Sequence, residues 1–161
     1  MTQPAGTESG TLAPASATGP DALRGLKVMV IDDSNTIRRS AEIFLLQAGC
    51  QVILAEDGFS ALAKIADHQP QVIFCDIVMP RLDGYQTCAL IKKNPHFAST
   101  PVVMLSSKDG LFDRARGRMV GSDEYLTKPF TKESLLRAVS THGGHKGEAA
   151  TPARELSATN E

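Results

Sequence analysis

Five polar residues that could do chemistry each follow or end a short apolar run. Asp32 and Asp33 follow the run LKVMVI, Asp76 follows VIFC, Ser106 follows PVVML, and Lys128 follows the short run YLT. Three carboxylates that lie close together repel one another unless they are protonated or bind a cation, and oxygen-only ligands suit Mg²⁺. A lysine and a hydroxyl are suited to phosphoryl oxygens. If the fold brings these groups together, they hold the parts needed to place a phosphoryl group on Asp76 with Mg²⁺ as cofactor.

The apolar runs are predicted strands, and helical patterns alternate with them. Continuous apolar runs bounded by breakers are typical of strands buried on both faces, and apolar residues three or four apart are typical of helices. We predict strands over 26–31, 51–55, 72–76, 101–105 and 125–127. Helices are predicted after Ser34 to Ala48, from Asp57 to before Pro70, and over 83–93, 111–120 and 132–141.

Strict alternation of strands and helices predicts an α/β fold, a five-stranded parallel sheet that is doubly wound with helices on both faces. Five-stranded sheets of the flavodoxin-like kind have strand order 2-1-3-4-5, and we adopt that order. The strands 26–31 and 72–76 are then neighbours. Asp32, Asp33 and Asp76 are therefore expected side by side at the carboxyl edge of the sheet, where such folds build their sites.

Length and composition limit the classes of protein that fit. The 161 residues and net charge of −1 indicate one domain without a field that favours nucleic acid. We place the domain at 25–144 and expect the polar tails 1–24 and 145–161 to be disordered. Three cysteines without a CxxC pair indicate buried, reduced thiols in a cytoplasmic protein. No apolar run reaches 18 residues and no signal peptide is evident, so no membrane insertion is expected.

Each polar feature alone has an ordinary structural explanation. An Asp-Asp pair after a strand is usually a turn or a helix cap, and a lysine is usually a solvated charge. The indication of function lies in the combination, on the right strand ends and in the right order.

The combined motifs resemble the response-regulator receiver domain (CheY-like). The residues that carry the resemblance are VIDDS at 30–34, DIVMPRLDG at 76–84, Ser106 and KPF at 128–130, within a match over about 26–141. The resemblance implies that Asp76 accepts a phosphoryl group from a histidine kinase. It further implies that Asp33, Asp76 and the backbone carbonyl of Val78 ligate Mg²⁺, with Asp32 acting through water.

The same resemblance assigns three further roles. Lys128 contacts the phosphoryl group, and the Lys128–Pro129 bond is cis. Ser106 and Tyr125 match the switch hydroxyl and the switch aromatic: phosphorylation pulls Ser106 toward the phosphoryl group and lets Tyr125 turn inward. A partner protein then reads the face made by the fourth helix, the fifth strand and the fifth helix.

Two further stretches, 83–92 and 106–113, resemble response regulators of type IV pilus twitching motility. This likeness implies a chemotaxis-like kinase as phosphodonor and the pilus motor system as output. Only about 20 polar residues follow the last predicted helix, so output by protein contact is expected and binding to nucleic acid is not. Arg114, Arg116 and Arg118 form either a partner patch or a solvated helix face.

Val78 leads to a separate expectation about the lifetime of the phosphoryl group. Its side chain, two residues past Asp76, offers no polar atom to hold an attacking water. We therefore expect slow self-hydrolysis compared with receivers that carry a polar residue there.

Four alternatives remain open from the sequence. The chain could serve another pathway such as flagellar chemotaxis, or be a degenerate receiver that works without phosphorylation. A haloacid-dehalogenase-type phosphatase also uses an Asp nucleophile with Mg²⁺, but it needs a second Asp where Val78 stands. A flavodoxin-like cofactor carrier would need a glycine- and hydroxyl-rich loop where Asp32 and Asp33 stand.

Overall fold

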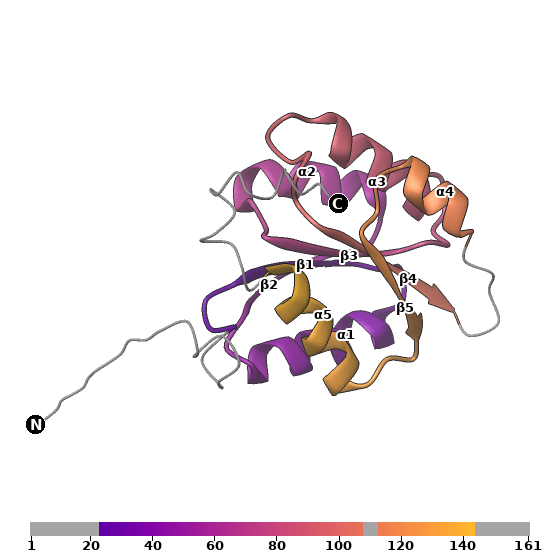
Figure 1. Cartoon of the computed structure of the whole chain (residues 1–161). Coiled ribbons are helices and arrows are strands. Elements are labelled where there is room, and N and C mark those ends of the chain that lie inside the picture. Colours follow the sequence, from indigo (N-terminus) through magenta and orange to yellow (C-terminus); the bar gives the residue numbers. More distant parts are fainter. Residues whose placement is uncertain (1–22, 108–112, 144–161) are drawn as a thin grey trace, which may run out of the picture.

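The computed structural model of the chain describes residues 23–107 and 113–143 (Figure 1). Five strands form one parallel sheet in the order β2-β1-β3-β4-β5, so the predicted order is confirmed. The strands are β1 (Lys27–Ile31), β2 (Gln51–Ala55), β3 (Val72–Asp76), β4 (Val102–Ser107) and β5 (Glu124–Lys128). The helices are α1 (Asn35–Gln47), α2 (Gly58–His68), α3 (Gly84–Lys93), α4 (Arg114–Met119) and α5 (Lys132–Gly143).

The sheet is covered on both faces, as expected for a doubly wound fold. Helices α2, α3 and α4 lie on one face, and α1 and α5 lie on the other (Figure 1). Alternate residues of a strand point to opposite faces. In β1, Met29 and Ile31 accordingly join the core under α2 and α3, while Val28 and Val30 join the core under α1 and α5. All five residues of the central strand β3 are buried, which explains its nearly unbroken apolar run.

Side chains that follow each strand cap the next helix. Ser34 accepts a hydrogen bond from the backbone N–H of Ile37, as predicted for the start of α1. Asp57 and Asp83 cap α2 and α3 in the same way, and Asp83 forms a reciprocal capping box with Gln86. These caps satisfy N–H groups that a helix leaves unpaired at its start. They also fix the turns that carry the residues at the carboxyl edge of the sheet.

Several element bounds differ from the sequence-based prediction by a few residues. Strand β4 continues through Ser106 and Ser107, which pair with Thr127 and Lys128 of β5. Pro101 precedes β4 and lacks the N–H that a ladder needs. The predicted start of the fourth helix at Leu111, residues 1–22 of the predicted N-terminal tail and the predicted C-terminal tail lie outside the described residues. Leu23, which the prediction placed in the N-terminal tail, is instead buried in the core under α1 and α5.

The three cysteines are free and buried, as predicted. Within residues 23–107 and 113–143, none of the helices is long and apolar enough to cross a membrane.

Candidate functional site

Three carboxylates meet at the carboxyl edge of the sheet. Strands β1 and β3 are neighbours with Ile31 opposite Cys75, so Asp32 and Asp76 end up side by side. Both are buried, with 0% and 3% of their surface exposed, whereas Asp33 is exposed. One oxygen from each of Asp32, Asp33 and Asp76 lies within 4.8 Å of the others. The predicted convergence of these three residues is therefore present in the structure.

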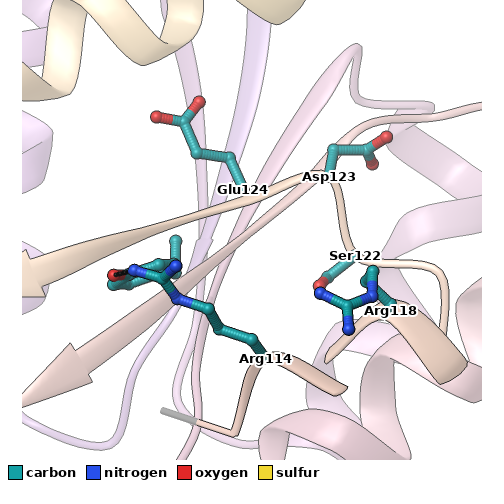
Figure 2. A pocket seen from close by; sticks show the side chains of 6 residues that line it. Arg114, Arg118, Ser122, Asp123 and Glu124 are labelled. Carbon is teal, nitrogen blue, oxygen red and sulfur yellow. Dashed lines mark hydrogen bonds between the residues drawn. The ribbon is translucent and has the colours of Figure 1, made fainter. Parts of the chain in front are cut away.

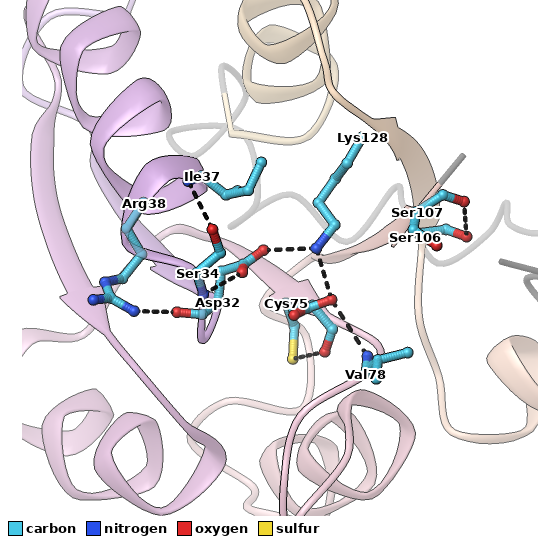
Figure 3. A network of polar contacts seen from close by, with 10 residues as sticks. Asp32, Ser34, Ile37, Arg38, Cys75, Val78, Ser106, Ser107 and Lys128 are labelled. Carbon is cyan, nitrogen blue, oxygen red and sulfur yellow. Dashed lines mark hydrogen bonds and ion pairs between the residues drawn. The ribbon is translucent and has the colours of Figure 1, made fainter. Parts of the chain in front are cut away.

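Lys128 bridges two of the carboxylates. Its Nζ lies 3.0 Å from Asp32 Oδ2 and 3.0 Å from Asp76 Oδ1. The lysine is the last residue of β5, the outer strand next to β4. Figure 3 shows its side chain extending to Asp32. The Lys128–Pro129 peptide bond is cis, as the resemblance implied.

The site carries more negative charge than its lysine balances. Burial, together with the neighbouring Asp32, raises the pKa of Asp76 to about 6, although Lys128 and the N–H of Val78 act to lower it. Burial alone would lower the pKa of Lys128, but its hydrogen bonds to Asp76 and Asp32 outweigh burial and raise it. Three carboxylates thus face one ammonium group, and an additional cation would stabilise the cluster.

Backbone N–H groups orient the two buried carboxylates, and a side-chain donor binds the backbone next to one of them. The N–H of Ser34 donates to Asp32 Oδ1 at 2.9 Å, and the N–H of Val78 donates to Asp76 Oδ1 at 3.3 Å. Arg38, which the sequence did not single out, donates to the carbonyl of Asp32 (Figure 3). The side chain of Val78 points away from this network and is 73% exposed.

A glycine allows α3 to begin close to Asp76. A Cβ on Gly84 would lie 2.3 Å from the carbonyl oxygen of Asp76, closer than any real contact. The N–H of Gly84 donates to the carbonyl of Ile77 at 2.8 Å. The loop after β3 is thereby held in a tight turn next to the carboxylates.

A second contact ties the same loop to α2. Arg81, which has φ of 70°, pairs with Asp57 at 3.1 Å and stacks on Phe59 with its Cζ 5.1 Å from the ring centroid. The positive φ of a bulky residue is uncommon and is offset here by these two contacts. Sequence reasoning missed this contact, because nothing in the local pattern around Arg81 or Phe59 indicates that the two side chains meet.

The predicted switch residues differ in their distance from the carboxylates: Ser106 follows Leu105, which pairs with Asp76, whereas Tyr125 lies against α4. Ser106 is 5% exposed and its Oγ donates to the carbonyl of Ser107 at 3.4 Å. In Figure 3 these two serines lie to one side of the lysine network. Tyr125 is half-buried, and its hydroxyl accepts a hydrogen bond from Arg114 at 2.7 Å. The structure thus places Ser106 near the site and Tyr125 at the adjoining α4–β5 surface.

Known proteins match both the sequence and the fold. The family described as the response regulator receiver domain matches residues 28–140. The chain is 73% identical over 118 residues to protein PilG of Pseudomonas aeruginosa, a match that covers 73% of this chain and 87% of PilG. It is 36% identical over 111 residues to the response regulator MprA of Mycobacterium sp. (strain KMS), covering 69% of this chain and 47% of MprA.

Among solved structures, the chemotaxis protein CheY4 of Vibrio cholerae superposes with a TM-score of 0.70 at 32% sequence identity. That match covers 73% of this chain and 98% of CheY4. The family match spans the sheet except for Lys27, the first residue of β1, and includes all of the polar residues at its carboxyl edge. The chain therefore belongs to the response regulator receiver domain family, with PilG and the CheY-like chemotaxis proteins among its relatives.

Proposed function

We propose that the chain is a phosphoacceptor of a two-component phosphorelay, in which Asp76 receives a phosphoryl group from a histidine kinase. One oxygen of the Asp76 carboxylate attacks phosphorus, the bond between phosphorus and the kinase histidine breaks, and an acyl phosphate forms on Asp76. The chain is then a regulatory protein that assists its own phosphorylation and dephosphorylation.

The observation that carries this proposal is the position of Asp76. It ends the central strand, only 3% exposed, with Lys128 at 3.0 Å and two further carboxylates within 4.8 Å. A lysine at this distance is placed to neutralise an oxygen of an incoming phosphoryl group. The buried carboxylate has little solvent to lose when the group arrives.

The donor set fits Mg²⁺. Asp33, Asp76 and the backbone carbonyl of Val78 would hold the ion, with Asp32 acting through water. The three carboxylates support this set, because their oxygens gather where negative charge is in excess. The bound ion would supply neutralisation of the charge that the carboxylates and the phosphoryl oxygens share.

Similarity favours one pathway over the alternatives. Identity to PilG is 73%, against 32% to the chemotaxis protein CheY4. We infer that the chain acts in the cytoplasm in type IV pilus twitching motility, with a chemotaxis-like kinase as donor. The phosphatase alternative is disfavoured because Val78 occupies the position where that chemistry needs an acid.

Output would occur through protein contact at the α4–β5–α5 face. A phosphoryl group on Asp76 would attract the hydroxyl of Ser106, and the space vacated would let Tyr125 turn inward, shifting the balance between two packings of this face. Arg114, Arg116 and Arg118 of α4 are all exposed and would contribute to partner binding.

Phosphorylation of the purified protein tests the assignment. Wild-type protein incubated with Mg²⁺ and radiolabelled acetyl phosphate should incorporate label that is lost at alkaline pH, as acyl phosphates are. Asp76→Asn should incorporate none, whereas Asp67→Asn, an exposed aspartate on α2, should behave as wild type. Label retained by Asp76→Asn would overturn the assignment of the phosphoacceptor.

A further inference from the structure

A groove between α4 and β5 brings arginine side chains next to the predicted switch tyrosine. It encloses about 480 Å³, and Figure 2 shows Arg114 and Arg118 reaching into it from α4. The residues that line the groove are Arg114, Arg118, Ser122, Asp123, Glu124 and Tyr125. These residues form both walls of the groove. A turn of the Tyr125 side chain would therefore alter the shape of the groove.

The two acidic residues of the groove have partners elsewhere. Asp123 accepts hydrogen bonds from Lys92 Nζ at 3.2 Å and from the N–H of Val102 at 2.8 Å. Glu124 lies 2.6 Å from His142 Nε2 on α5. These contacts draw both carboxylates away from the arginines of α4.

Arg114 instead contacts Tyr125 twice. Its Nη2 donates to the Tyr125 hydroxyl at 2.7 Å, and its Cζ lies 5.3 Å from the centroid of the Tyr125 ring. A guanidinium that both donates to the phenol and faces the ring restrains the direction in which the side chain points.

The start of α4, where Arg114 lies, is anchored to α3. The N–H of Asp113 donates to the Tyr85 hydroxyl at 2.9 Å, and Arg116 lies over the Tyr85 ring with its Cζ 4.4 Å from the centroid. Arg116 also lies 3.6 Å from Asp83. The backbone at Arg114 is therefore held in place by α3, so Arg114 does not move with Tyr125 when that side chain turns.

Tyr125 and Ser106 lie on the same face of the sheet. Ser106 pairs with Thr127 and Met104 pairs with Tyr125, and residues two apart on a strand share a face. Met104 belongs to the core under α2 and α3, and the partly buried Tyr125 packs against that core. A shift of Ser106 therefore opens space on the side toward which Tyr125 would turn.

We propose that Arg114 is a positioning residue that holds Tyr125 at the α4–β5 groove and so opposes its inward turn. This inference rests on the proposed function of Ser106 and Tyr125 as a switch. Removing the contact should shift the equilibrium toward the inward position about tenfold, which corresponds to about 1.4 kcal/mol. By linkage, Arg114→Ala should bind the phosphoryl mimic beryllofluoride more tightly than wild type does.

Fluorine NMR of protein labelled with 3-fluorotyrosine tests the proposal directly. The chain has two tyrosines, so Tyr85→Phe and Tyr125→Phe assign the two resonances. A neutral gadolinium chelate broadens the resonance of a ring in proportion to its exposure. Without any phosphoryl mimic, Arg114→Ala should decrease the broadening of Tyr125, because the released ring turns inward.

A Tyr125 ring that does not turn inward would give a different change in broadening. If Tyr125 stays in place, loss of the guanidinium uncovers the ring and the broadening rises or stays the same, which would overturn the proposal. Arg118→Ala is the matched control, since it removes a guanidinium from the same helix and groove and should leave Tyr125 unmoved. An equal inward turn in Arg118→Ala would also overturn the specific role of Arg114.

A separate arm reports on the proposed function. Wild-type protein with Mg²⁺ and beryllofluoride should show Tyr125 less broadened than without them. An unchanged Tyr125 in this arm would contradict the phosphoryl-driven switch, while the Arg114→Ala arm would still decide whether Arg114 holds the ring.

Discussion

The backbone and the side chain of Val78 have different environments: the backbone contacts the site, and the side chain faces solvent. Its N–H donates to Asp76 at 3.3 Å, while the side chain is 73% exposed and apolar. Val78→Asn places an amide that can hold a water near the acyl phosphate. We expect this variant to lose the phosphoryl group severalfold faster than wild type, measured as decay of radiolabel from purified phosphoprotein.

The control keeps the side chain apolar. Val78→Ala offers no polar atom either and should retain the wild-type lifetime. If Val78→Ala and Val78→Asn decay equally fast, the polarity of this residue does not set the rate.

Asp76 makes the stability of the metal-free protein depend on pH. Its pKa is raised from 3.8 to about 6, so the folded protein binds this proton more tightly than the unfolded chain does. The stabilisation by the protonated form is present below about pH 4 and is lost as the pH rises to about 6. Asp76→Asn mimics the neutral form and should be more stable than wild type by about 1–3 kcal/mol above pH 6.

Urea unfolding in the presence of EDTA measures this difference across the pH range. The stability of Asp76→Asn minus that of wild type should grow from pH 4 to pH 6 and then level off. A difference that shrinks over the same interval would show that ionised Asp76 stabilises the fold.

At the scale of residues, the sequence predicts the positions of the carboxylates better than the contacts made by the side chains around them. Asp32 and Asp76 converge because strand order alone decides which strand ends are adjacent. The contact of Arg114 with Tyr125 was not predictable, because it depends on how α4 sits against β5. The positive φ of Arg81 likewise depends on a tertiary contact, with Asp57 and Phe59, that no local pattern reveals.

At the scale of elements, the approach of α3 to the end of β3 is the tightest packing near the site. In most helix interiors Gly→Ala stabilises by about 1 kcal/mol, because alanine has the better helix propensity. At Gly84 the added Cβ would meet the Asp76 carbonyl oxygen at 2.3 Å and the Ile77 Cα at 2.7 Å. We expect Gly84→Ala to destabilise the protein by about 1–3 kcal/mol, because backbone must move to accept the methyl group.

Chemical denaturation measures the effect, and Ala63→Gly on the exposed side of α2 calibrates the propensity contribution. Gly84→Ala should also weaken Mg²⁺ binding, because the displaced backbone includes Asp76 itself. A Gly84→Ala variant as stable as wild type would mean that α3 can move away without cost.

The strands and helices were largely predictable from their apolar spacing, and the errors have physical reasons. Ser106 and Ser107 are polar and lie beyond the predicted strand 101–105, yet β4 includes them because β5 supplies ladder partners. Glu124 and Lys128 extend β5 in the same way. Pairing between strands, which is a tertiary property, overrides the local preference of a polar residue.

At the scale of the molecule, the packed unit depends on residues close to the bounds of the described chain. Leu23 and Leu26, 8% and 2% exposed, join the core under α1 and α5. A Cβ on Gly143 would lie 2.5 Å from Val72 Cγ2, so the end of α5 lies directly against β3. We therefore expect a fragment of residues 23–144 to unfold with a free energy within about 0.5 kcal/mol of the full chain.

A shorter fragment sharpens the comparison. A chain that starts at Lys27 lacks both leucines and should lose about 2–5 kcal/mol, measured by urea unfolding. Equal stability of the two fragments would show that the segment before β1 contributes nothing to the core.

The register of β4 with β5 has a consequence for how such proteins diverge. The carboxylates follow β1 and end β3, whereas the groove that would meet a partner lies between α4 and β5. Ser106, at the end of β4 next to β3, pairs with Thr127 of β5. If the proposed roles of the two regions hold, substitutions in α4 would direct the protein to a new partner and leave the carboxylates unchanged. After gene duplication, substitutions in this one helix would then suffice to place one copy in a different signalling pathway.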